Sequence, residues 1–430
     1  MSTIRRNHAP QFKAKVALEA LAGEKTIHEI AAKHQVHPNQ VTQWRRQLVD
    51  QAAEVFGKSS GRTQADDQEK KPQHLDLAKH PPLACSLCFS DHGLRLDAEK
   101  FEPDYPAGMP CPNCHAVGGK MLPKKAVGAL AHRFFVWGSM RRTDYGGAPQ
   151  IQFNDKRTTS IPVSPWLKAD VALFERLLGI GFFRYSPRLW MIGWITPLKD
   201  LQDLEKRRSV IARIIREYPC VNYGSDRIFY RVRLAPRVPS DPLQYDSPPD
   251  GSLCNGRVDS TGFPVLYASP DLATCLHECR VTAEDEAFVA TMYPARKLRL
   301  LNLAVLLRED HPVTEFESLD MTVHMIFLAG KHAYKIVQEI ARAARAARFD
   351  GLIFPSYFSL VRLGIMPFQT TYGISNRHLP SLQGHEESKT VPNLALFGRP
   401  VTSGDVKIRC INRIILNNVH YGYHFGPVTF

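Results

Sequence analysis

Four cysteines with a regular spacing constrain the fold of this chain most. Cys85 and Cys88 form one Cys-x-x-Cys pair, and Cys111 and Cys114 form a second pair, separated from the first by 22 residues. Each pair lets two thiolates approach one ion, and four thiolates satisfy tetrahedral zinc. The segment between the two pairs has too little apolar content to fold unaided. The spacing therefore predicts a structural zinc knuckle, closed by four sulfurs and not catalytic.

The residues leave two alternatives to zinc open, namely reduced cysteines without a ligand and a redox pair. His92 and His115 lie nearby as alternative ligands, although the cysteines are the better candidates. The chain holds nine cysteines, an odd number. Together with the metal-type spacing, this indicates a reducing compartment rather than a disulfide scaffold, so we expect a cytoplasmic location.

The composition predicts a multidomain globular chain with a polyanionic partner. A length of 430 residues corresponds to roughly two to four domains. The net charge of +13 suggests nucleic acid or a nucleotide-type ligand. The N-terminus has no apolar signal region, and the most apolar stretch is broken by Arg184, Pro187 and Arg188. We therefore expect no membrane association.

The segment 1–56 carries two short amphipathic helices in succession. The first is preceded by a capping-box spacing, and the second begins near Pro38 and buries Val41 and Trp44 on one face. The free side of the second helix is polar and basic, which is typical of a helix-turn-helix. Its predicted DNA-contact residues are Asn39, Gln40, Gln43, Arg45 and Arg46. A small three-helix bundle with a solvated basic face remains the alternative.

Residues 5 to 56 also resemble the DNA-binding subunit of insertion-sequence transposases. The resemblance implies that the second helix reads terminal inverted repeats. The chain departs from that family afterwards, because no heptad repeat follows and no acidic catalytic triad can be placed downstream. The segment is thus either a working DNA anchor or the remnant of an insertion fused in frame to another gene.

Glu278 is set apart from the apolar face of its predicted helix. Ser269 and Pro270 form a cap and first-turn pair for a helix that carries Leu272 and Leu276 on one side. Glu278 lies two residues beyond Leu276, about 200° round the helix. Taken alone, this position is most simply that of a solvated glutamate.

Other polar residues on predicted elements suggest a shared cleft with Glu278. The elements are a strand at 227–235, a loop, a strand at 263–269, the helix and a short strand ending at 356. The five candidates that they contribute are Arg231, Arg257, Tyr267, Glu278 and Ser356.

The order and local sequence of these five residues resemble the RES domain, which is named for arginine, glutamate and serine. The matching stretches are YRV, GRVDSTGFPVLYAS, LATCLHE and FDGLIFPS, and the resemblance covers about 225–375. One departure is GRVD at 256–259, where many relatives have an aromatic residue and then asparagine after the arginine.

The RES resemblance implies an ADP-ribosyltransferase-like α+β fold and an enzyme that consumes NAD. The implied reaction is N-glycosidic cleavage to nicotinamide and an ADP-ribose product, with water, phosphate or protein as acceptor. The enzyme would accordingly be an NAD glycohydrolase, an NAD phosphorylase or an ADP-ribosyltransferase. Many members are toxins of toxin–antitoxin pairs, so an antitoxin protein is an expected partner.

The resemblance also suggests a role for each candidate. Glu278 is expected to stabilise oxocarbenium character at the ribose and to hold a ribose hydroxyl. Arg231 and Arg257 would bind the pyrophosphate or the nicotinamide side. Tyr267 offers an aromatic face for stacking, and Ser356 a hydrogen bond at the nicotinamide or ribose end. We assign Glu278, Arg231 and Tyr267 as catalytic and Arg257 and Ser356 as NAD-binding.

The expected fold is multidomain, with an all-α N-terminus, a zinc-knuckle and helical accessory region and an α+β RES domain. The expected order is helix-turn-helix (1–56), linker (57–80), zinc knuckle (81–122), mixed accessory region (123–224), RES domain (225–380) and C-terminal extension (381–430). Two apolar runs in the extension favour edge or capping strands. The alternative function is a non-enzymatic DNA-binding regulator or a transposase-derived fusion protein.

Overall fold

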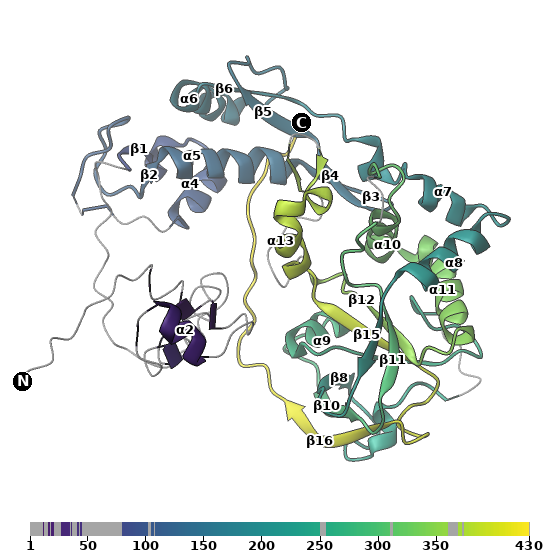
Figure 1. Ribbon diagram of the computed structural model, residues 1–430. Helices are drawn as coiled ribbons and strands as arrows, with labels where there is room; N and C mark the ends of the chain where they lie inside the picture. Colours follow the sequence, from purple (N-terminus) through teal and green to yellow (C-terminus); the bar gives the residue numbers. More distant parts are fainter. Residues whose placement is uncertain are drawn as a thin grey trace, which may run out of the picture. The chain divides into compact units, whose positions relative to one another are not determined.

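The computed structural model divides the chain into two compact units, residues 1–71 and 72–430. It describes residues 12, 16–17, 19–20, 27–34, 36, 41–42, 44, 80–101, 105–106, 108–249, 255–309, 313–359, 369–371 and 374–429. Figure 1 shows both units and labels most of their elements.

The N-terminal unit has a small apolar core. Its helix α2 (Ile27–His34) buries Ile30 and Ala31 against Val41 and Trp44, as the sequence predicts. The carboxylate of Glu19 is held to the end of α2 by Lys33 Nζ and His34 Nε2, each at 2.7 Å. These hydrogen bonds, that of His34 first, lower the pKa of Glu19 to about 2.

The first part of the second unit is a separate apolar core built on aromatic residues. The elements of this core are β1 (Pro82–Cys85), α4 (His92–Glu99), β2 (Met121–Pro123), α5 (Lys124–Ala131), β5 (Ile151–Asp155), α6 (Lys168–Leu178) and β6 (Ile180–Arg184). The ribbon of β3 (Met140–Thr143) and β4 (Gly146–Pro149) lies between α5 and β5 in the sequence, and its Ala148 is buried in the larger core described below. Phe135 and Phe182 pack at the centre of the aromatic core with ring centroids 4.2 Å apart. Gly179 ends α6 in the left-handed conformation, with φ of 71°, which a residue without Cβ adopts without strain.

Two β-sheets packed face to face form the rest of the second unit. One has five strands in the order β7 (Cys220–Tyr223), β11 (Leu298–Asn302), β12 (Gly351–Pro355), β15 (Pro392–Phe397) and β9 (Val265–Ala268). The other has three, in the order β16 (Val406–Ile414), β10 (Ala287–Pro294) and β8 (Phe229–Leu234). A short ribbon of β13 (Thr370–Thr371) and β14 (Ile374–Ser375) lies outside both sheets.

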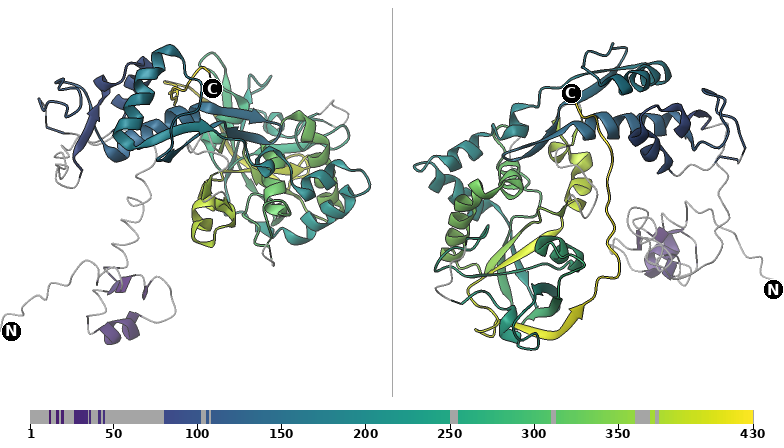
Figure 2. Two further views of the ribbon diagram at one scale, coloured as in Figure 1. Left: turned by 90° about the horizontal axis from the view of Figure 1, so that it is seen from above. Right: turned by 180° about the vertical axis from the view of Figure 1, so that it is seen from behind.

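Side-chain alternation explains why both faces of the five-stranded sheet are covered. In β12, Leu352 and Phe354 face the helices, whereas Ile353 between them faces the three-stranded sheet. The helices on the first face are α7 (Thr196–Gln202), α8 (Arg207–Glu217), α10 (Leu319–Leu328) and α11 (Tyr334–Ala346). Strands β11 and β12 are parallel, and α10 and α11 make the crossover between them (Figures 1 and 2).

Helix α9 (Leu272–Cys279) packs on the three-stranded sheet and carries Glu278. The expected cap, Ser269, is wrong: Asp271 caps the helix, and its carboxylate accepts from Thr274 N at 2.6 Å. Ser269 is unsuited to the role because its backbone pairs with Tyr230 in a β-bridge, which keeps the chain extended until Asp271. The helix ends at Arg280, whose φ is 52°.

The two apolar runs near the C-terminus form strands at different positions in the sheets, one at an edge and one in the interior. Strand β16 lies at an edge, as expected, but β15 lies between β12 and β9 and is not an edge strand. Its residues Leu394, Ala395 and Leu396 are all buried, so burial on both faces explains its apolar sequence. Helix α13 (Gln383–Ser388) precedes β15.

Beyond β16, residues 415–429 run as an extended strap back to the aromatic core (Figures 1 and 2). Phe425 packs against that core, and its N–H donates to Asp97 Oδ2 at 2.9 Å. Gly426 approaches Gly138 so closely that a Cβ on either residue would come within 2.5 Å of the other's Cα. The strap therefore ties the sheets to the N-terminal part of the same unit.

Candidate active site

A cleft of about 480 Å³ opens where β8, β9, α9 and the ends of β12 and β15 meet. Of the five candidates from the sequence, four line the cleft, namely Arg231, Arg257, Tyr267 and Glu278. The fifth, Ser356, contacts Glu278 directly. The fold thus brings together residues that are far apart in the sequence.

Glu278 faces the cleft and is fixed there by two donors. Ser356 Oγ and Asn393 Nδ2 each donate to Glu278 Oε1 at 2.6 Å. Ser356 follows β12 and Asn393 belongs to β15, and both are buried. The side chain of Glu278 is itself exposed. Its carboxylate is therefore anchored through one oxygen and open to the cleft.

Arg231 is a buried cation whose hydrogen-bonding capacity is only partly used. Its Nη1 donates to the Tyr267 carbonyl at 2.7 Å and its Nη2 to the Asp246 carbonyl at 3.1 Å. The Nε atom has no acceptor among the described residues. Burial, and secondarily Arg233, lowers the pKa of Arg231 to about 9, so the guanidinium stays charged at neutral pH. A buried charge with a free donor is unfavourable until an anion binds.

Arg257 is held in the cleft by the end of α10. Its Nη1 donates to the carbonyls of Ile326 and Ala329 at 3.2 and 3.0 Å, where the helix dipole favours a cation. Its guanidinium lies over the ring of Tyr334, 5.0 Å from the centroid. Burial lowers the pKa of Arg257.

The Tyr267 hydroxyl fixes the loop that carries Arg257. It donates to Asp259 Oδ1 at 2.5 Å and accepts from the backbone N–H groups of Val258 and Asp259 at 2.8 and 3.1 Å. Burial and the Asp259 carboxylate raise the pKa of Tyr267 well above its usual range. Asp259, the last residue of the GRVD sequence, is thus the hydrogen-bond acceptor of the Tyr267 hydroxyl.

Two side chains of helix α11 also hold this loop. Gln338 Nε2 donates to the carbonyls of Gly256 and Asp259 at 3.0 and 2.9 Å, and Arg342 Nη2 donates to Ser260 Oγ at 2.7 Å. Arg342 therefore also contacts the loop. A Cβ at Gly256 would lie 2.0 Å from Asp259 Oδ1, so the tight loop requires glycine there.

Several residues of the cleft were missed in the sequence. They are Arg233, Arg280, Tyr334, Phe354, Tyr357, Phe358, Cys275, Cys279 and Asn393. Asn393 had only a weak signal, as a polar residue at the start of an apolar run. Tyr334 and Tyr357 had no signal in the sequence, because the pattern of a helix or strand does not show which of its ends meets a cleft.

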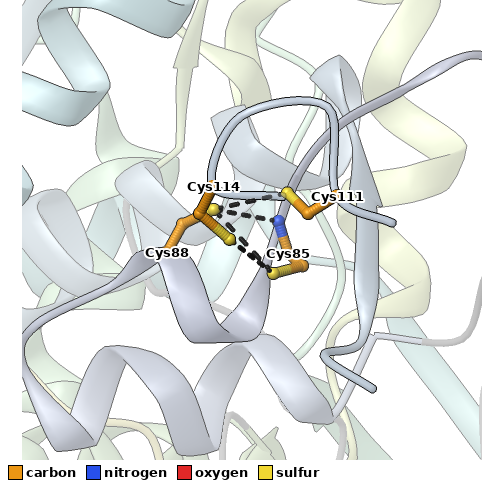
Figure 3. Close-up of side chains that lie close together, drawn as sticks. All are labelled: Cys85, Cys88, Cys111 and Cys114. Carbon is orange, nitrogen blue, oxygen red and sulfur yellow. Dashed lines mark hydrogen bonds between the residues drawn. The ribbon is translucent and has the colours of Figure 1, made fainter. Parts of the chain in front are cut away.

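The four cysteines meet in one cluster, shown in Figure 3. The Sγ–Sγ distances are 3.8 Å for Cys85–Cys88, 3.6 Å for Cys85–Cys114 and 3.5 Å for Cys88–Cys111. All four sulfurs lie within 4.8 Å of one another. Such a cluster could hold a metal ion. Burial raises the pKa of the Cys85 thiol, so a nearby cation would be needed to keep it ionised.

The predicted DNA-contact residues Asn39, Gln40, Gln43, Arg45 and Arg46 lie outside the described residues. Of the apolar residues expected behind them, Val41 and Trp44 are described and buried.

Comparison with known families confirms both resemblances found in the sequence. Residues 228–367 match the family described as RES domain, and residues 4–76 match the transposase helix-turn-helix family, described as Transposase. The chain therefore carries a RES domain of mixed α/β structure and a transposase-type helix-turn-helix. No curated protein and no solved structure matches it. Over the described part of the chain, every helix is too short or too polar to cross a bilayer.

The loop contacts generate a prediction for Tyr267→Phe. The change removes one donor to a buried carboxylate and one acceptor of two N–H groups, so we expect a loss of about 1–3 kcal/mol in the free energy of unfolding. Urea denaturation of the full chain measures this loss. The matched control is Tyr293→Phe in β10, where the described residues make no bond to the hydroxyl and a change within about 0.5 kcal/mol is expected. Equal losses in the two variants would contradict the loop contact.

Proposed function

We propose that the RES domain of this chain cleaves the N-glycosidic bond of NAD. The observation that carries the proposal is the pairing, in one cleft, of an anchored carboxylate with a buried arginine that has an unused donor. These are Glu278 and Arg231. The RES match supports an activity on NAD in general, and the cleft chemistry suggests how the reaction would proceed.

The charges of the cleft suit a dinucleotide. Arg231, Arg233, Arg257 and Arg280 line it, and Glu278 is the one carboxylate among the described residues of its lining. The pyrophosphate of NAD would balance the positive charge of these arginines and accept hydrogen bonds from their guanidinium groups. The rings of Tyr334, Tyr357 and Phe358 also line the cleft and would stack on the nicotinamide or adenine ring.

Glu278 would act on the ribose. When the bond between ribose C1′ and the nicotinamide nitrogen breaks, its electron pair leaves with nicotinamide, which becomes neutral. Positive charge develops on the ribose, and a carboxylate beside it stabilises that charge. An acceptor oxygen then bonds to C1′ and gives up its proton. Water, phosphate and a protein side chain all satisfy this balance, so the acceptor is a matter for experiment.

We further propose that the chain acts as the toxin of a toxin–antitoxin pair, because loss of NAD would arrest growth. This role rests on the RES match. Growth and the NAD content of a bacterial host expressing the chain test it. We expect both to fall with the unchanged chain and to recover with Glu278→Gln. Arrested growth at normal NAD content would contradict the proposal.

The first enzymatic prediction concerns Glu278→Gln. The amide keeps the shape but removes the negative charge, so we expect the rate of NAD loss to fall by about 100-fold or more. The measurement is NAD consumption by the purified full chain, with and without phosphate, and the products identify the acceptor.

A matched control comes from Glu284→Gln, an exposed glutamate after α9, which should keep the full rate. An unchanged rate in Glu278→Gln would rule out the catalytic role. Absence of turnover in the folded, unchanged chain would leave a DNA-binding regulator as the better proposal.

We also propose that the cysteine cluster binds structural zinc. Four sulfurs about 2.3 Å from a tetrahedral zinc lie about 3.8 Å from one another, and the distances of 3.5–3.8 Å in the cluster fit this geometry. Cys85, Cys88, Cys111 and Cys114 would be the ligands. With four sulfurs bound, the ion would have no open position for water and would contribute stability rather than chemistry.

Metal analysis tests the zinc proposal. We expect about one zinc per chain, lost together with thermal stability in Cys88→Ser. The control Cys220→Ser changes an exposed cysteine in β7 and should keep its zinc. A metal-free, equally stable protein would favour reduced cysteines without a ligand.

Finally, we propose that the transposase-type helix-turn-helix binds DNA through the face predicted from the sequence. The double variant Arg45→Ala with Arg46→Ala should weaken binding to a pool of random duplexes and reduce the salt slope by about 2. Lys58→Ala, in the predicted linker, should leave the slope nearly unchanged. No retention of duplexes by the unchanged chain at low salt would favour an inactive fusion remnant.

A further inference from the structure

Asn393 contacts Glu278 but lies outside the RES match. It is the second residue of β15 and 6% exposed, and it pairs in register with Phe354 of β12. The RES match ends at residue 367, and no sequence motif singled this residue out. Asn393 is nevertheless as close to the Glu278 carboxylate as Ser356 is, at 2.6 Å.

The neighbouring strands β12 and β15 bring the two donors to the same oxygen. Pro355 pairs with Pro392, and Ser356 N donates to the Val391 carbonyl at 2.9 Å. The same stretch of pairing between β12 and β15 therefore fixes the positions of both Ser356 and Asn393. Both bonds end on Oε1, and no described residue donates to Oε2. Oε2 is the oxygen left for a ligand in the cleft.

The two donors differ in what else they do. Ser356 Oγ also accepts from Phe358 N at 3.1 Å, so its position depends on the turn after β12. The Asn393 amide is fixed by the strand itself. Its orientation is dictated by chemistry, because the reversed amide would place Oδ1 against the carboxylate oxygen.

We propose that Asn393 is a positioning residue that holds the Glu278 carboxylate with Oε2 turned into the cleft. The ribose as the target of Oε2 rests on the proposed cleavage of NAD, whereas the positioning of the carboxylate does not. A purely structural asparagine would stabilise the strand end without changing how Glu278 titrates. The test therefore follows the Glu278 carboxyl itself.

The first measurement is a carboxyl carbon NMR titration of the full chain labelled at glutamate, with the Glu278 signal assigned by its absence in Glu278→Gln. Donors stabilise the ionised form, so Asn393→Ala should move the titration midpoint to higher pH by about one unit, a tenfold change in protonation. The isosteric Asn393→Asp sets a second carboxylate beside the first and should move the midpoint further. A midpoint unchanged in folded Asn393→Asp would overturn the proposal.

The control is Asn302→Ala in β11 of the same sheet, whose side chain accepts from Ala304 N at 3.1 Å. It should leave the Glu278 midpoint in place. A shift equal to that of Asn393→Ala would mean that general loosening of the sheet, not positioning, moves the carboxyl.

Kinetics separate this proposal from that of NAD cleavage. With turnover, Asn393→Ala should lower kcat by about 10- to 100-fold, change KM little and move the acid limb of the kcat profile to higher pH. The limb moves up because Glu278 would stay protonated to a higher pH. A titration shift without any NAD turnover in the unchanged chain would uphold the positioning and overturn NAD cleavage. NAD turnover together with an unshifted Glu278 titration would uphold NAD cleavage and overturn the positioning role of Asn393.

Discussion

The insertion of β15 between β12 and β9 is the constraint on which the rest of the cleft depends. This strand comes from near the C-terminus, yet it pairs on one side with the strand before Ser356 and on the other with the strand that carries Tyr267. One set of backbone hydrogen bonds thereby fixes Asn393, Ser356 and the Tyr267 carbonyl in relation to one another. A slip of one residue would turn every side chain of β15 to the other face, and Asn393 would then no longer contact Glu278.

The cleft combines this rigid frame with charges that are unfavourable without a ligand. Arg231 is buried on the three-stranded sheet, donates to two backbone carbonyls and keeps one donor unused. Folding alone would not favour such an arrangement, because a buried guanidinium needs an anion or a full set of acceptors. The unsatisfied charge is thus better explained by binding than by stability, which is why it carries the proposed function.

Tyr267 and Arg257 show how positioning is divided among neighbouring elements. The tyrosine hydroxyl and Gln338 hold the loop 256–260 from two sides, and the end of α10 holds the arginine that the loop presents. The sequence suggested that Tyr267 presents a stacking face, which stays a prediction. Its hydroxyl is already committed to the loop, so the tyrosine also determines where Arg257 lies.

The sequence by itself predicted several local elements and selected five residues that the fold brings to the cleft. Strand-type sequence patterns predicted β8, β9 and β12, and the motif order selected Arg231, Arg257, Tyr267, Glu278 and Ser356. The cysteine spacing likewise predicted the cluster, because a single turn brings the two cysteines of each pair together. Strand patterns and each Cys-x-x-Cys pair depend on residues close together in the chain, whereas the choice of the five site residues rests on the family resemblance.

Only the tertiary structure decided the interior position of β15 and the contact of Asn393 with Glu278, and it replaced Ser269 with Asp271 as the cap of α9. The physical reason is the same in each case. An apolar strand has the same sequence pattern at an edge or in the interior of a covered sheet, and a cap depends on where a distant strand pairs. Pairing partners far apart in the sequence leave no periodic signal, so these features appear only when the strands are assembled.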